Sequence, residues 1–196
     1  MKVQRLRRAP GPAEMAAMYP EPHDHRIYGR GHGERVEATI ALAREVLQDV
    51  GRRTVADLSC GNGHIARQLC TEQPQGLHLG DYAGAVGAPG EHLYLGAVEH
   101  TLPMLPTVDV FVCSETIEHL DDPGLVLRLA RAKAGTLVLS TPLDCWDDAN
   151  GEHLWAWDRQ FVEHLMDLHG WAPAAFTSVD SREYGEPYLY GIWVAS

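Results

Sequence analysis

The stretch Val55-Ala-Asp-Leu-Ser-Cys-Gly-Asn-Gly63 decides the fold. Residues Thr54–Leu58 predict a short buried strand, and the glycines after them predict a tight turn into a helix over Gly63–Glu72. In an open α/β sheet such a turn binds adenosine-containing ligands, because glycine lets the backbone approach closely and the helix N-terminus offers free N–H groups. Asp81 lies 20 residues after Gly61, where a carboxylate can accept hydrogen bonds from ribose hydroxyls.

Strand and helix signals alternate outward from this turn. Apolar runs predict six further strands, at Gly76–Leu79, His92–Leu95, Val108–Ser114, Gly135–Ser140, Ala174–Val179 and Tyr188–Val194. Helical spacing and capping residues predict three further helices, at Glu34–Val50, Leu125–Lys133 and Arg159–His169. Alternating strands and helices indicate an α/β fold with a mainly parallel, doubly wound sheet, and the last two strands indicate an antiparallel hairpin at one edge.

Composition narrows the classes of protein that remain. The chain has 196 residues, 45% of them hydrophobic, which suits one domain with a sizeable core. Its net charge of −11 argues against non-specific binding to nucleic acid. No apolar run is long enough to span a bilayer, and no secretory signal follows Met1, so we expect no membrane association and a cytoplasmic protein. The four cysteines form no CxxC pair and are expected to be buried thiols: Cys60, Cys70, Cys113 and Cys145.

The N-terminal 33 residues differ in composition from the rest. Proline, glycine and histidine dominate residues 9–33, so we interpret 1–33 as an irregular lead-in or lid and 34–196 as the domain. A basic cluster opens the chain, and a solvated terminus is favoured over a phosphate contact for its members Lys2, Arg5, Arg7 and Arg8.

The glycine turn resembles the first motif of the class I S-adenosylmethionine-dependent methyltransferases, (V/I)LDxGxGxG. The matching positions are Val55, Asp57, Ser59, Gly61 and Gly63, with serine in place of the first glycine. Four further segments resemble later motifs of this family in the same order: Gly96–Pro103, Asp109–Glu115, Leu139–Pro142, and His153 to Phe161 followed by Gly170-Trp171. In the first of them, Ala97 replaces the acid that contacts adenine in the family.

The resemblance implies a Rossmann-like seven-stranded sheet and S-adenosylmethionine as cofactor. It places the cofactor against seven residues: Asp57, Ser59, Gly61, Gly63, Asp81, Glu115 and Arg35, the last meeting the methionine carboxylate. It also implies methyl transfer to an oxygen, or less readily a nitrogen, of a small-molecule acceptor. Three departures keep open a cofactor-binding partner protein that does not catalyse: Ser59, Ala97 and the segment between Asp81 and Leu93, which is too short for a normal crossover helix.

A Glu-x-x-Glu-His segment follows the predicted strand at Val108–Ser114. If the turn is helical, Glu115, Glu118 and His119 share one face at the carboxyl edge of the sheet. His119 is then a candidate general base, with Glu115 or Glu118 orienting it. A divalent metal is the less favoured alternative, with His153 completing the ligand set.

The same segment resembles the metal-binding Glu-x-x-Glu-His of small-RNA 3′-terminal 2′-O-methyltransferases. The stretch His153-Leu-Trp-Ala-Trp-Asp-Arg159 is similar to that family's second histidine motif. A metal-assisted RNA methyltransferase is therefore an alternative function, which the net charge of −11 and the absence of an RNA-binding extension weigh against.

Two further sets of residues, one in the lead-in and one of tryptophans, each have two possible roles. In the resembled family a segment such as the lead-in can fold over the cofactor, which makes Tyr28, His32 and Arg35 candidates, and a solvated arm is the alternative. The tryptophans near the end of the fifth strand are interpreted as loop packing rather than as the wall of an acceptor pocket: Trp146, Trp155 and Trp157.

Overall fold

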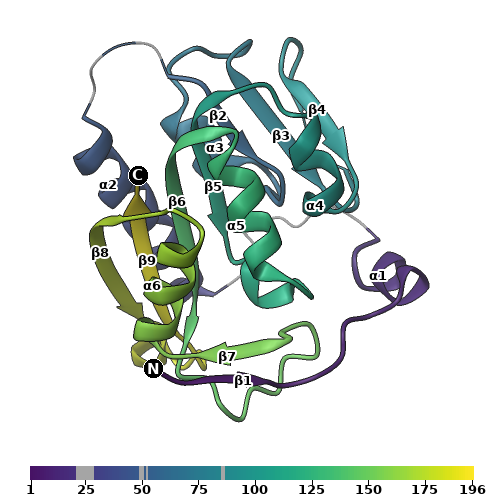
Figure 1. Cartoon of the computed structure of the whole chain (residues 1–196), viewed down its shortest axis with the longest axis vertical. Helices are drawn as coiled ribbons and strands as arrows, with labels where there is room; N and C mark the ends of the chain where they lie inside the picture. The colour runs from purple at the N-terminus through teal and green to yellow at the C-terminus, as the bar shows by residue number, and fades with distance from the viewer. Residues whose placement is uncertain (21–28, 49–50, 52, 85–86) are drawn as a thin grey trace.

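A seven-stranded sheet organises the computed structural model, which describes residues 1–20, 29–48, 51, 53–84 and 87–196. The strand order is β4-β3-β2-β5-β6-β9-β8 (Figure 1). The strands are β2 (Val55–Asp57), β3 (Leu77–Asp81), β4 (His92–Leu95), β5 (Val108–Ser114), β6 (Ala134–Leu143), β8 (Pro173–Asp180) and β9 (Leu189–Ala195).

The sheet confirms the predicted mixed topology. Strands β4, β3, β2, β5 and β6 run parallel, and β9 lies antiparallel between β6 and β8. Strands β8 and β9 are joined by a short 3₁₀ helix, η4 (Ser181–Tyr184). This connection is too short for a crossover, so the two strands pair antiparallel. All the parallel strands therefore end at one carboxyl edge, where the glycine turn also lies.

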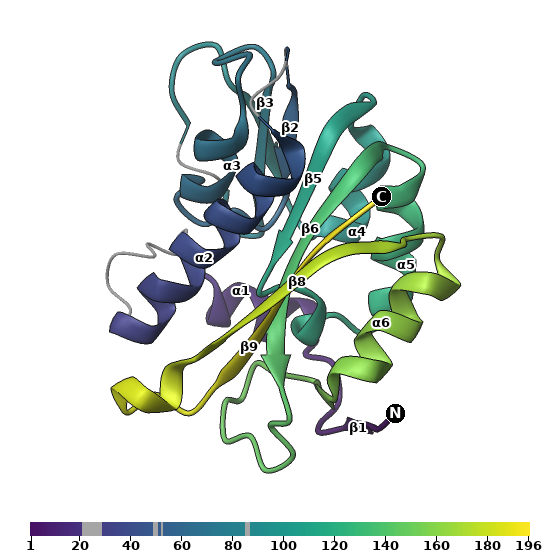
Figure 2. The same cartoon turned by 90° about the vertical axis from the view of Figure 1, so that its left-hand side faces the viewer.

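Helices cover both faces of the sheet (Figure 2). One face carries α2 (Arg30–Leu47) and α3 (His64–Leu69), and the other carries α4 (Val98–Thr101), α5 (Pro123–Arg131) and α6 (Arg159–Leu168). Two apolar clusters follow from this layering. One includes Val36, Ile65 and Leu79 beneath α2 and α3, and the other includes Leu127, Leu139 and Trp157 beneath α5 and α6.

Helix α2 begins earlier than the periodicity predicts. It starts at Arg30 instead of Glu34, because Gly29 caps it and a carboxylate oxygen of Glu186 accepts a hydrogen bond from the Gly31 amide at 2.7 Å. That oxygen comes from a distant residue, so no local signal announces it. Val50, expected at the end of this helix, lies outside the described residues.

The connection from β3 to β4 lacks a crossover helix in its described residues, as its length suggests. Strand β4 nevertheless pairs in parallel with β3, from His78 opposite His92 to Asp81 opposite Leu95. The missing helix leaves part of this edge strand uncovered, and Leu95 is 74% exposed.

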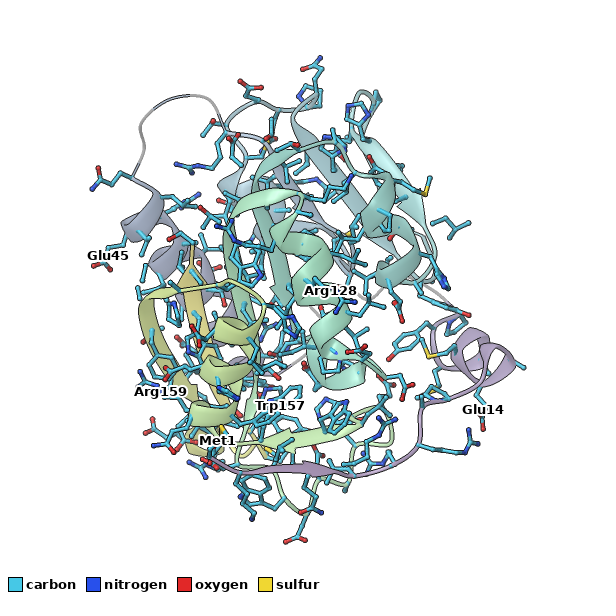
Figure 3. All side chains as sticks on the ribbon, viewed as in Figure 1. Met1, Glu14, Glu45, Arg128, Trp157 and Arg159 are labelled. Atoms are coloured by element: carbon cyan, nitrogen blue, oxygen red, sulfur yellow. The ribbon has the colours of Figure 1, made fainter. Side chains whose placement is uncertain are left out.

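Residues 1–20 contain regular elements and specific contacts, where the sequence analysis favoured a solvated basic terminus. Strand β1 (Val3–Arg5) pairs antiparallel with β7 (Trp155–Trp157), and α1 (Pro12–Met18) follows. In Figure 3, Met1 lies near the start of α6 and Glu14 on the opposite side of the molecule, so this segment crosses one end of the protein.

The basic residues of this segment have specific partners. Arg5 forms an ion pair with Asp121 at 2.5 Å and lies over the ring of Trp155. The Arg7 guanidinium donates to the backbone carbonyls of Asp148, Asn150 and His153. These contacts join segments more than 100 residues apart, which is why composition alone suggested a solvated terminus.

Two further expectations concern the cysteines and the membrane. All four cysteines are free thiols; Cys60, Cys70 and Cys113 are buried and Cys145 is partly buried. Among the helices of the described residues, none has both the length and the apolar composition that crossing a membrane requires.

The packing of β6 gives a test of the core. Leu139 is fully buried in the centre of this strand, so Leu139→Ala should lower the free energy of unfolding by about 3 kcal/mol through lost burial and a residual cavity. Leu95→Ala, the same change on the exposed edge strand, should change it by less than about 0.5 kcal/mol. Urea unfolding of both variants measures the difference, and equal losses would contradict this description of the core.

Candidate active site

The glycine turn adopts the geometry that its sequence predicts, with one instructive departure. Gly61 and Gly63 have φ values of +51° and +72°, in the left-handed region that favours glycine. Ser59, at the position of the missing first glycine, is not among the non-glycine residues with positive φ. Its hydroxyl lies 2.5 Å from that of Thr116 in the turn after β5. Serine therefore fits here and links two loops of the carboxyl edge.

Asp81 lies beside this turn. Its carboxylate accepts a hydrogen bond from the Gly61 amide at 2.9 Å, and its backbone carbonyl accepts one from Gly96 at 3.1 Å. Asp57 is buried, and its carboxylate accepts from the Ser59 amide at 3.2 Å. The two predicted acids of β2 and β3 thus each accept a hydrogen bond from a backbone amide of the glycine turn.

Arg35 is fully buried, although it carries a full positive charge. One guanidinium nitrogen donates to the hydroxyls of Ser114 and Ser140, at 2.5 and 3.1 Å, and another lies 3.1 Å from Nε2 of His32. Its Nε has no hydrogen-bond partner among the described residues. The ends of β5 and β6 therefore position a buried cation with one unused donor.

The turn after β5 is not the helix that the spacing argument assumed. Glu115 has φ +52° and accepts from the Ser140 hydroxyl at 3.0 Å, and a 3₁₀ turn, η3 (Ile117–His119), begins only after it. Glu115 is therefore directed toward Arg35 and β6, apart from the other two residues of the motif. The expectation that all three share one helical face is wrong.

Glu118, His119 and His153 do come together. One ligand-type atom from each of these residues lies within 4.8 Å of the other two, and the two imidazole centroids are 4.9 Å apart. Glu118 is 1% exposed; one of its oxygens accepts from Thr141 at 3.0 Å, and the other has no hydrogen-bond partner in the described part of the chain. Glu115 is not part of this cluster, so three of the four predicted metal-site residues converge.

Two groups behind this cluster were missed by the sequence analysis. Nδ1 of His153 lies 2.6 Å from a carboxylate oxygen of Asp148, and both side chains are buried. The hydroxyl of Tyr19 lies 3.4 Å from Nδ1 of His119 and donates to Glu152 at 3.0 Å. The sequence offered no signal for Tyr19, because it precedes His119 by 100 residues and lies in a segment interpreted as irregular.

The tryptophans confirm the packing interpretation for the loop. Trp155 donates to the carbonyl of Leu120 at 2.8 Å, and the fully buried Trp157 donates to the carbonyl of Pro142 at 3.1 Å. Lys2 lies over the ring of Trp146, with its Nζ 3.6 Å from the centroid. Tyr28, named above as a candidate over the cofactor, lies outside the described residues.

Burial dominates the electrostatics of this edge. It raises the pKa of Asp57 to about 7, against the smaller lowering effect of the Ser59 amide. Burial also raises the pKa of Glu115, and Arg35 opposes that change. The pKa of Glu118 is raised well above its ordinary value, first by burial and then by the charge of Glu115. Three acids with raised pKa values at one strand edge are typical of a functional site.

Comparison with known proteins supports the fold. Neither a family model nor a curated protein sequence matches the chain. The solved structure of Burkholderia thailandensis 1,6-didemethyltoxoflavin-N1-methyltransferase, with S-adenosylhomocysteine bound, is similar over 98% of this chain and 93% of its own, with 15% identity and a TM-score of 0.69.

Two other solved structures are similar over somewhat less of the chain. Magnesium protoporphyrin IX methyltransferase from Synechocystis, with S-adenosylmethionine bound, matches 84% of this chain and 79% of its own, with 15% identity and a TM-score of 0.58. The [4+2]-cyclase SpnF matches 88% and 83%, with 12% identity and a TM-score of 0.59. The chain therefore has the fold of the class I methyltransferases, a fold that also serves a cyclase.

The buried Asp57 gives a pH-dependent prediction. Because its pKa is raised to about 7 in the folded protein, wild type loses this group's stabilising contribution as the pH rises from about 4 to 7. Asp57→Asn cannot ionise at this position. Its free energy of unfolding should therefore rise relative to that of wild type by about 3–4 kcal/mol over this range.

Urea unfolding from pH 3 to 8 measures this change. Asp180→Asn is the matched control. Because Arg182 lowers the pKa of Asp180, this carboxylate stabilises the folded protein at neutral pH, and wild type should lose that stabilisation only as the pH falls. A constant difference between Asp57→Asn and wild type from pH 4 to 7 would show that Asp57 ionises normally.

Proposed function

We propose that the chain is an S-adenosylmethionine-dependent methyltransferase that methylates an oxygen of a small-molecule acceptor. The observation that carries this proposal is the direct contact of the glycine turn with the turn that bears Glu118 and His119. Ser59 and Thr116 are the residues in contact, with their hydroxyls 2.5 Å apart. A cofactor on the first turn would therefore lie next to the acid–histidine cluster on the second.

The polar groups of the edge fit this cofactor. Arg35 has a buried, unused N–H donor, which the methionine carboxylate would satisfy. Asp81, Gly61 and Gly63 are the proposed ribose and close-approach residues. Glu99, two residues after Ala97, has a buried carboxylate oxygen without a partner in the described residues, and an exocyclic adenine amine is a donor of the type it lacks.

The cofactor supplies a methyl group already activated by its sulfonium. The protein has to align the acceptor with that methyl and exclude water, and alignment alone can lower a barrier by about 7–11 kcal/mol. A neutral hydroxyl must also lose a proton. We assign that task to His119, next to the buried Glu118, with Glu115 nearer Arg35 and the cofactor.

Removal of the Asp81 carboxylate tests the cofactor site. Asp81→Ala should weaken binding of S-adenosylhomocysteine about 100-fold or more, because two ribose hydrogen bonds to a charged acceptor are lost. Asp180→Ala, at an exposed carboxylate paired with Arg182, should bind like wild type. Isothermal titration calorimetry measures both affinities, and unchanged affinity in Asp81→Ala would remove this residue from the site.

A metal-assisted reaction is the second candidate, and a specific observation favours it. One carboxylate oxygen of Glu118 and one ring nitrogen each of His119 and His153 lie within 4.8 Å of one another, and Glu118 also has an oxygen without a hydrogen-bond partner in the described residues. Asp148 is hydrogen-bonded to Nδ1 of His153, and carboxylates commonly support metal-bound histidines in this way. These residues would suit Mn²⁺, Co²⁺ or Mg²⁺, and an RNA 3′ end is one acceptor that such a site could take.

Loss of the imidazole and loss of metal separate the two candidates. His119→Ala should lower kcat about 100-fold or more in both, whereas His164→Ala, on the exposed side of α6, should not change it. Activity that survives EDTA identifies a base, and activity that EDTA removes and Mn²⁺ restores identifies a metal site.

The assay follows S-adenosylhomocysteine release with a panel of phenols, alcohols, heteroaromatic amines and short RNA oligonucleotides. Methylation confined to RNA would overturn the small-molecule proposal. Tight S-adenosylhomocysteine binding without methylation of any acceptor would favour the non-catalytic alternative.

A further inference from the structure

Tyr19 brings the N-terminal segment into the candidate active site. It follows α1, its ring centroid lies 6.1 Å from that of Tyr82, and its hydroxyl lies between Glu152 and His119. Tyr82 directly follows Asp81 at the end of β3, so Tyr19 lies between the proposed ribose acid and the histidine cluster.

The hydrogen bonds of Tyr19 have a definite direction. An ionised carboxylate only accepts, so the single proton of the Tyr19 hydroxyl is directed to Glu152, 3.0 Å away. The phenolic oxygen is then an acceptor toward Nδ1 of His119, at 3.4 Å, and the hydrogen of that contact comes from the imidazole.

The opposite nitrogen of His119 faces the acid–histidine cluster. Its Nε2 lies 3.8 Å from the unused oxygen of Glu118. When Nδ1 carries the ring hydrogen of a neutral imidazole, Nε2 carries a lone pair. An unprotonated Nε2 is required in both candidate reactions, to accept a proton or to bind a metal.

The N-terminal segment also shapes the loop that carries Glu152. Arg7 donates to the carbonyls of Asp148, Asn150 and His153, and the Asn150 side chain accepts from the Glu152 amide at 3.0 Å. Both partners of the hydrogen bond between Tyr19 and Glu152 thus depend on the same segment for their position.

We propose that Tyr19 and Glu152 are positioning residues that hold His119 in its Nδ1–H tautomer, so that the unprotonated Nε2 faces Glu118 and His153. The chemical use of that nitrogen rests on the proposed function. The tautomer is a property of the resting chain and is measured without any reaction, so failure of this inference and failure of the proposed function are distinguishable.

Nitrogen-15 NMR of the imidazole rings in the full-length protein tests the inference, because protonated and unprotonated ring nitrogens resonate far apart. In wild type, Nδ1 of His119 should be protonated and Nε2 unprotonated, at a pH where the ring is neutral. Tyr19→Phe removes the oxygen, and the two shifts should move toward each other as the tautomers mix.

Variants of Glu152 make the test directional. Glu152→Ala frees the Tyr19 hydroxyl to donate to Nδ1, so the pattern should invert to the Nε2–H tautomer. Glu152→Gln retains an accepting oxygen and should keep the wild-type pattern. In a small-molecule assay, Tyr19→Phe should lower kcat about 10-fold and leave the KM for S-adenosylmethionine unchanged.

Tyr94→Phe is the matched control, because the Tyr94 hydroxyl lies 3.0 Å from Nδ1 of His78 at the far edge of the sheet. This variant should alter the His78 ring signals and leave those of His119 unchanged, and wild-type His78 signals in the other variants report an intact sheet. Wild-type His119 protonated on Nε2, or a Tyr19→Phe spectrum identical to that of wild type, would overturn the inference.

Discussion

A buried positive charge organises the candidate active site. Arg35 is a fully buried residue of α2. Its guanidinium donates hydrogen bonds to the hydroxyls of Ser114 in β5 and Ser140 in β6. A buried charge without compensation is costly, and here hydrogen bonds to these hydroxyls and attraction to nearby carboxylates offset that cost. Arg35 opposes the rise in pKa that burial causes at Asp57 and Glu115. The acids of the edge and this cation therefore depend on one another.

The same constraint separates the two glutamates of the Glu-x-x-Glu-His segment. Glu115 adopts a left-handed backbone conformation and is hydrogen-bonded to Ser140, beside Arg35. Glu118 is directed to Thr141 and to the two histidines. One acid thus accompanies the cation, on the side we propose for the cofactor, and the other accompanies the imidazoles, on the side we propose for the acceptor. The division of roles that we propose rests on this difference in partners.

The N-terminal segment has a structural role that its composition conceals. Pairing of β1 with β7 and the hydrogen bonds from Arg7 fix the loop that carries Asp148, Glu152 and His153. That loop follows the long strand β6, and it is also hydrogen-bonded to Tyr188 through Asp148. The chain thus uses its first residues to order a loop that belongs to the second half of the sequence.

Local sequence patterns were sufficient for the fold and for the glycine turn. The apolar runs of β4 and β5 were located to the residue, because a strand buried or paired along its length leaves a continuous signal. The spacing of Gly61 and Asp81 placed both at one edge, since parallel strands end together. These are short-range properties of a chain and need no knowledge of distant contacts.

Only the tertiary structure determined how the site is assembled. The start of α2 depends on Glu186, the tautomer we propose for His119 depends on Tyr19, and the orientation of His153 depends on Asp148 and Arg7. The unused oxygen of Glu118 likewise becomes visible only once burial is known. Hydrogen bonds between segments up to 155 residues apart leave no periodic trace in the sequence, because they depend on where the folded backbone brings two side chains together.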